Sequence, residues 1–107
     1  MKKMGQLYRS GIWTVKSGKV EEFIKAWQTS VEWLVEHHPG GWGGEALLLQ
    51  DIGSSYKFIS FAWSTRPEVT EELLSKTEFR SFMVNLQELC DELQPHIMRV
   101  AGYSASQ

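Results

Sequence analysis

The chain has 107 residues, 42% apolar and 22% charged, which suits one globular domain with a single core. Its net charge of −2 excludes the clustered positive surface that nucleic-acid binding needs, and no apolar run approaches the about 20 residues that span a bilayer. Cys90 is the only cysteine, so no internal disulfide forms. Without a signal-peptide pattern, we expect a cytoplasmic protein with no nucleic-acid or membrane partner.

The first predicted element is a strand over residues 6–15, which are rich in β-formers. Odd positions such as Arg9, Gly11 and Trp13 share one face, and Tyr8 belongs to the other. Gly11 indicates a bulge or a close backbone approach. A helix follows over residues 20–35, because its apolar residues keep the i, i+3, i+4, i+7 spacing.

Trp33 lies outside the apolar stripe of this helix. It marks either a second contact surface or a single exposed aromatic residue. Pro39 and two glycines end the helix, and Trp42-Gly43-Gly44 is expected to be a loop. Trp42 belongs either to a plain turn or to a lid or interface, where its large side chain would contact a ligand. The loop lacks the Lys-Ser/Thr ending of a phosphate cradle and precedes a strand.

Residues 45–63, EALLLQDIGSSYKFISFAW, predict two strands joined by a turn at residues 53–55. Both strands are apolar on both faces, whereas a sheet wetted on one side alternates apolar and polar residues. Exposing the second face would leave a larger apolar patch than monomers normally show. The hairpin therefore predicts that helices cover one face and a second copy of the chain covers the other.

Two helical patterns follow Trp63: a short one around residues 69–74, and a longer one that Thr77 can cap. The longer apolar stripe runs from Phe79 to Leu93 and includes Cys90, for which core packing is expected. Pro95 is expected to break this helix, and residues 96–103 to form the last strand.

The order βαββαβ predicts an α+β, ferredoxin-like fold with a four-stranded antiparallel sheet and both helices on one face. The first and third strands are central in this arrangement. The second apolar face then predicts a two-fold homodimer, in which the sheets face each other as a dimeric α+β barrel.

Over nearly its whole length the chain resembles the antibiotic-biosynthesis-monooxygenase (ABM) domains of the dimeric α+β barrel superfamily, so residues 1–107 are expected to be one ABM-like domain. The resemblance rests on EEFIKAW, HPGGWGGEALLLQD and FISFAWSTRPEVTEELLSKTEFRSF. It implies a cavity between helices and sheet. Some relatives oxidise quinols or polyketide phenols there with O₂ and no cofactor, and others bind and degrade heme.

The resemblance makes Trp63 the candidate catalytic residue, because it matches the family's tryptophan at the end of the third strand. Heme-degrading members also need an asparagine on the first strand and a histidine on the helix after the tryptophan. Here the only asparagine is Asn85, and no histidine lies between Trp63 and Pro95. We therefore expect no heme and no other cofactor. The resemblance implies that cofactor-free oxygenases also commonly carry this helix histidine, so its absence here counts against their chemistry as well.

Further candidates for ligand contact lie near the strands. Arg9 and Arg99, on adjoining strands, could hold an anionic or phenolic oxygen, or could pair with Glu45 or Asp51. Tyr8 and Tyr56 offer phenolic donors, or simply pack.

No metal site is expected, since His37 and His38 point about 100° apart on a helix. Two functions remain open: a cofactor-independent monooxygenase for an aromatic or quinol-type substrate, and a non-catalytic dimeric module that binds a hydrophobic or aromatic metabolite. Trp63 and the resemblance favour the first function, and the lack of acid–base residues favours the second.

Overall fold

The computed structural model describes residues 7–37, 42–64, 72 and 75–104. Its elements are β1 (Leu7–Val15), α1 (Val20–His37), β2 (Trp42–Gln50), β3 (Lys57–Ser64), α3 (Thr77–Glu88) and β4 (Cys90–Arg99). The βαββαβ order is the one that the sequence predicts. The short helix expected around residues 69–74 lies outside the described residues, apart from Glu72.

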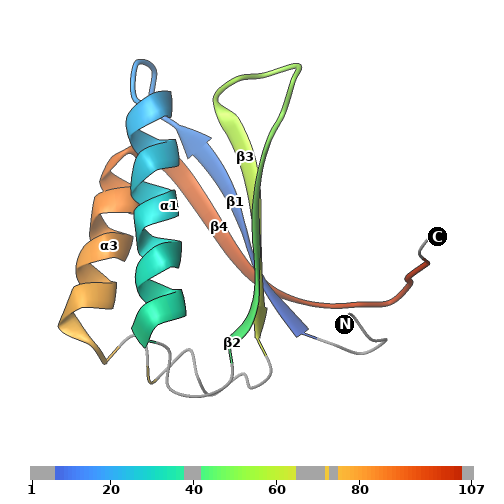
Figure 1. The fold of residues 1–107 in the computed structure, drawn as a ribbon. Helices are drawn as coiled ribbons and strands as arrows, with labels where there is room; N and C mark the ends of the chain where they lie inside the picture. Colours follow the sequence, from blue (N-terminus) through green and yellow to red (C-terminus); the bar gives the residue numbers. More distant parts are fainter. Residues whose placement is uncertain (1–6, 38–41, 65–71, 73–74, 105–107) are drawn as a thin grey trace.

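The four strands form one antiparallel sheet in the order β2-β3-β1-β4, with β1 and β3 in the centre as expected. Both described helices cover the same face, and no described helix lies on the other face (Figure 1). This is the predicted ferredoxin-like arrangement. After β4 the chain leaves the sheet on the side away from the helices (Figure 1).

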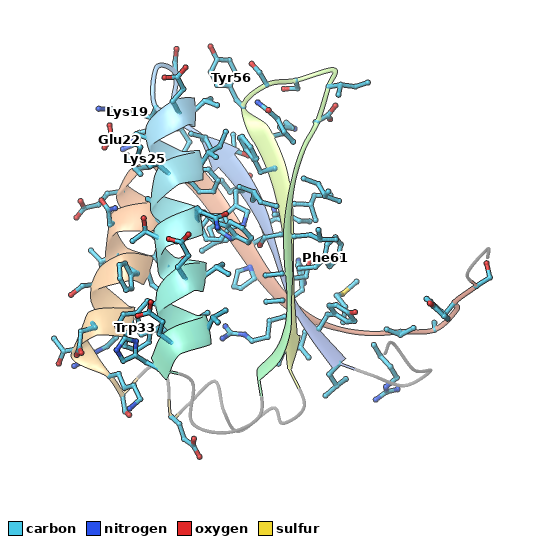
Figure 2. The ribbon with its side chains drawn as sticks, viewed as in Figure 1. Lys19, Glu22, Lys25, Trp33, Tyr56 and Phe61 are labelled. Atoms are coloured by element: carbon cyan, nitrogen blue, oxygen red, sulfur yellow. The ribbon has the colours of Figure 1, made fainter. Side chains whose placement is uncertain are left out.

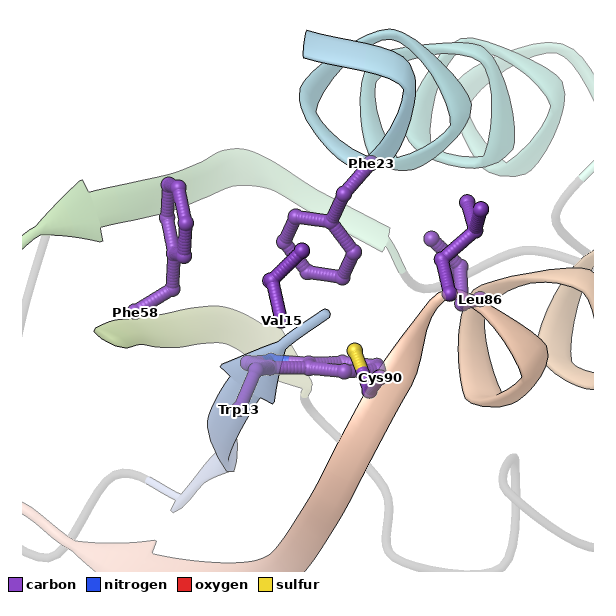
Figure 3. Close-up of a cluster of buried hydrophobic side chains, with 7 residues drawn as sticks. Trp13, Val15, Phe23, Phe58, Leu86 and Cys90 are labelled. Atoms are coloured by element: carbon purple, nitrogen blue, oxygen red, sulfur yellow. The ribbon is translucent and has the colours of Figure 1, made fainter. Parts of the chain in front are cut away.

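The main core forms where β1 and β3 meet α1. Trp13 is paired with Phe58 in the sheet register, and the Phe23 ring of α1 lies 5.2 Å from Trp13 and 5.1 Å from Phe58 (Figure 3). The largest fully buried side chains are Phe23 and Phe58, followed by Leu86 and Val15. The predicted division of β1 into two faces is confirmed, because Gly11, Trp13 and Val15 are buried while Ile12, between Gly11 and Trp13, is exposed.

Trp33 is part of the contact between the two helices, which decides between its two interpretations. Its ring lies 6.3 Å from Phe79 and 6.0 Å from Phe82 of α3, and it stacks on His37 at 4.8 Å. Leu34 and Phe79 form a second, smaller core, against which Trp33 packs (Figure 2). The residue outside the main stripe therefore packs α1 against α3.

The sequence-based boundary between the last helix and the last strand is wrong. α3 ends at Glu88 and β4 begins at Cys90, so Leu93, Pro95 and His96 lie inside a strand. Pro95 does not break a helix; it is accommodated because β4 is an edge strand, where a missing N–H is tolerated.

A β-bulge accounts for the misleading pattern. Trp13 pairs with Leu93 and Thr14 with Glu92, but Val15 pairs with Cys90, which leaves Asp91 as an extra residue. Two strand residues three apart normally point to opposite faces, and the bulge brings Cys90 and Leu93 back to the same core. The resulting i, i+3 spacing imitates a helical stripe.

The first hairpin strand also begins earlier than expected. Trp42-Gly43-Gly44, predicted as a loop, belongs to β2, which pairs Trp42 with Ser64. The register shifts between Trp42 and Ala46, so the glycines lie at an irregular part of the strand.

Gly11 confirms the predicted close approach. The Trp13 indole N–H donates to Ser60 Oγ at 2.9 Å, and the ring lies over the glycine. A Cβ on Gly11 would stand 2.8 Å from Trp13 Nε1 and 3.1 Å from Ser60 Oγ. The register continues through this position without a bulge.

The substitution Gly11→Ala should therefore lower the free energy of unfolding by about 1–3 kcal/mol, because the Trp13 ring is buried and cannot move aside. Gly102→Ala is the matched control, since no atom lies within 4 Å of its Cβ position. Urea denaturation followed by tryptophan fluorescence measures both. Equal stability of the two variants would contradict the packing described for Gly11.

Cys90 packs in the core as expected, and burial, with Asp91 nearby, raises the pKa of its thiol to about 11 from an ordinary 9.0. The folded state therefore favours the neutral thiol, and its contribution to stability is complete below pH 9.0 and lost as the pH rises towards about 11. We expect the free energy of unfolding to fall more steeply over this interval in the wild type than in Cys90→Ala. Parallel slopes in denaturant titrations would contradict it.

Candidate functional site

Five of the six predicted site residues gather at one end of the sheet, where β1 and β2 begin and β3 and β4 end. In the register Tyr8 pairs with Trp63, Arg9 with Ala62 and Leu7 with Arg99. Trp42 begins β2 at the same end, opposite Ser64. Residues from all four strands, far apart in sequence, thus lie close together.

Tyr56 does not belong to this group. It lies at the opposite end, where the Val15 N–H donates to the Tyr56 carbonyl oxygen at 2.8 Å. Figure 2 shows Tyr56 near the β2–β3 turn, at the end where α1 begins. A ligand at the Arg9 end is therefore out of reach of its phenol.

Trp63 and Trp42 are placed through their backbones only. Trp63 is the next-to-last residue of β3, and Trp42 is the first of β2. The contacts of their side chains lie outside what the structure describes. Their roles in catalysis and ligand contact stay predictions.

Arg9 lies on the helix-facing side of β1, in the same row as Gly11 and Trp13. Its side chain is half-buried, and loss of water around the guanidinium lowers its pKa. Asp51, one of its two expected partners, is in the turn at the far end of the sheet, where it accepts a hydrogen bond from the Gly53 N–H at 2.7 Å. Among the described residues, Arg9 forms no ion pair.

Tyr8 lies on the opposite side of the same strand. Its ring meets Phe61 edge-on at 6.4 Å, and Figure 2 shows Phe61 on the side of β3 that faces away from the helices. The two rings border a hollow of about 420 Å³ between the sheet and the segment after β4. Arg99 lines the same hollow, so the structure brings two predicted ligand residues, Tyr8 and Arg99, to one place.

We call the sheet surface without helices the open face; it also includes His96, which sequence reasoning had set aside. His96 pairs with Ser10, two positions from the Tyr8–Met98 pair, and is exposed. The sequence placed it at the start of a strand, next to a supposed helix break. The face on which it lies follows from the register between β1 and β4.

The described residues limit the chemistry of both surfaces. They contain no cluster of three or more His, Cys, Asp or Glu side chains that could hold a metal ion. His37 is engaged at the end of α1, with Nδ1 at 3.1 Å from the Trp33 carbonyl oxygen. Neither described helix, α1 or α3, is long and apolar enough to cross a membrane.

No protein-family model matches the sequence, and no curated protein matches it. Solved structures do match the fold. A conserved protein from Methanosarcina mazei Go1 superposes with a TM-score of 0.75 at 18% identity, over 90% of this chain and 93% of the other. SnoaB, a cofactor-independent oxygenase from Streptomyces nogalater, gives 0.74 at 16% identity, over 96% and 95% of the two chains.

A third similar structure is a candidate antibiotic biosynthesis monooxygenase from Nitrosomonas europaea, with a TM-score of 0.73 at 16% identity. It covers 92% of this chain and 94% of its own length. The resemblance noted in the sequence is thus matched by the architecture. The chain has the ferredoxin-like α+β fold of the ABM-type proteins.

Proposed function

We propose that this chain is a single ABM-like domain that acts on an aromatic or quinol-type substrate, as a cofactor-independent monooxygenase. The observation that carries the proposal is the half-buried guanidinium of Arg9, on the helix-facing side of a fold that a cofactor-independent oxygenase shares. The substrate would lie at that guanidinium, near the strand end that holds Trp63.

The positive charge of Arg9 would act on the phenolic oxygen of the substrate. A partly desolvated cation favours a phenolate or enolate oxygen over its protonated form, so it lowers the pKa of a bound phenol. The resulting anion is electron-rich enough to reduce O₂. With an anthrone-type substrate, one oxygen atom enters the substrate as a carbonyl, the other leaves as water, and the substrate supplies all four electrons.

The alternative is a binding module without catalysis. Arg9 pairs with Ala62 of β3 and Ile97 of β4, and the residues that share its row of β1 are Leu7, Gly11, Trp13 and Val15. None of them titrates near neutral pH. α3 has no histidine. A substrate held at Arg9 would then have to lose its proton to solvent, or not react.

We propose further that the chain forms a homodimer through the open face. Five apolar side chains there are between 40% and 51% exposed: Ile12, Leu47, Leu49, Ile59 and Met98. Covering a half-exposed side chain of this size contributes on the order of 1 kcal/mol, and a two-fold axis uses each contact twice. The patch is continuous across the central strands, which supports sheet-to-sheet packing.

Oxygen consumption with a panel of anthrones and hydroquinones tests the catalytic proposal. We expect Arg9→Met to lower kcat/KM by about tenfold or more, Arg9→Lys to retain part of it, and Arg80→Met on α3 to leave it unchanged. Trp63→Phe should lower kcat if Trp63 is catalytic. Absence of turnover in the wild type would contradict the oxygenase. Arg9-dependent binding without turnover would instead support the module.

Sedimentation velocity tests the dimer. Ile59→Lys, which puts a charge in the centre of the open face, should shift the protein from dimer to monomer at micromolar concentration. Val84→Lys on α3, where the wild-type valine is 52% exposed, is the matched control and should stay dimeric. A wild-type protein that is monomeric at these concentrations would refute the interface.

A further inference from the structure

We propose that Arg99 binds a carboxylate of the aromatic substrate whose phenolic oxygen is held by Arg9. The inference rests on the substrate site proposed at Arg9, and it names the substrate class: a phenol with a carboxylate at its other end. The observation that carries it is the placement of two arginines on one face of the sheet, in neighbouring strands, beside an exposed apolar residue.

The pairing of β1 with β4 places Arg99 on the face of Arg9. Arg99 pairs with Leu7, which belongs to the row of Arg9 because alternate residues of a strand point to the same face. Arg9 pairs with Ile97, so Arg9 and Arg99 are diagonal neighbours, which lie about 7–8 Å apart in an antiparallel pair. Arg99 also borders the hollow beside Tyr8, but alternation directs its side chain to the helix-facing side.

The described helices leave the end of β4 uncovered on this face. Ile97, opposite Arg9, is 59% exposed, and Arg99 is exposed as well. Figure 1 shows the second half of β4 running away from both described helices. Arg9 is half-buried on the neighbouring strand. A flat ring can therefore lie on Ile97, with one end at Arg9 and the other at Arg99.

The charge on this face selects an anionic ligand. Among the described residues, neither arginine forms an ion pair. The described strand residues around the two arginines on this face are all uncharged: Leu7, Gly11, Ala62, Pro95 and Ile97. Neighbouring cations repel each other, and an anion bound beside them offsets this repulsion. A carboxylate also accepts two parallel hydrogen bonds from a guanidinium.

The two environments assign a different ligand group to each arginine. Arg9 is the less hydrated cation, and it suits the phenolic oxygen, which ionises at neutral pH only with help from the protein. Arg99 is exposed, and it suits a carboxylate, which is already ionised at neutral pH. The ligand would thus place its phenol inward and its carboxylate towards solvent.

Titration calorimetry with two matched ligands tests the inference. One is a hydroxynaphthoate with its hydroxyl and carboxylate at opposite ends of the ring system, and the other is the naphthol that lacks the carboxylate. Arg99→Gln should raise the Kd of the hydroxynaphthoate by about tenfold or more and change that of the naphthol less than about twofold. Arg99→Lys should recover part of the affinity, and Arg9→Met should weaken both ligands. Arg80→Gln on α3 is the matched control and should change neither.

Three results would overturn the inference, with circular dichroism to confirm that each variant is folded. The first is an effect of Arg99→Gln that is absent, or equal for the two ligands. The second is an effect of Arg80→Gln as large as that of Arg99→Gln, which indicates unspecific attraction to positive charge. The third is loss of hydroxynaphthoate binding in Tyr8→Ala as large as in Arg99→Gln, which places the ligand on the open face.

The titrations also separate this inference from the proposed function, because they need no turnover. Absence of oxygen consumption would refute the oxygenase and leave Arg99-dependent binding intact. Arg9-dependent binding without any effect of Arg99 would refute the present inference alone. Failure of the wild type to bind either ligand would overturn the sites at Arg9 and Arg99 together.

Discussion

The contact on which the rest of this structure depends is the one between the Trp13 indole and the residues around it. The ring packs on Phe23 of α1, its N–H donates to Ser60 on β3, and only a glycine at position 11 leaves room for it. It therefore links the two central strands and the first helix at one point. The indole N–H has a hydrogen-bond acceptor within the core, where an unpaired donor would lower the stability of the fold.

This anchor fixes which residues of β1 face the helices, and so determines where chemistry can occur. With Trp13 and Val15 buried, Arg9 must also face the helices, while Tyr8 and Ile12 face the other way. Arg9 is half-buried on the helix-facing side, where its guanidinium loses water, whereas Tyr8 packs against Phe61 on the open face. One strand end thus offers two surfaces, the helix-facing one proposed for an anionic or phenolic oxygen and the open one proposed for the partner chain.

The sequence predicted the helices, most of each strand and the faces of β1, because alternation and helical periodicity carry that information directly. The strand order followed from the usual packing of a βαββαβ chain. The prediction failed at Cys90 and Leu93, where a bulge gives strand residues a helical spacing. The grouping of Tyr8 with Arg99 needed the register, which local patterns do not contain. Tyr56 was misjudged for the same reason, since its position depends on which end of the sheet the hairpin turn occupies.

A crystal structure of the protein soaked with an anthraquinone, the product of the proposed reaction on an anthrone, tests the central claim most directly. The account predicts a carbonyl oxygen of the product within hydrogen-bond distance of the Arg9 guanidinium, on the helix-facing side of β1 and near the end of β3. Electron density for the product only at other surfaces, with no contact to Arg9, would contradict it.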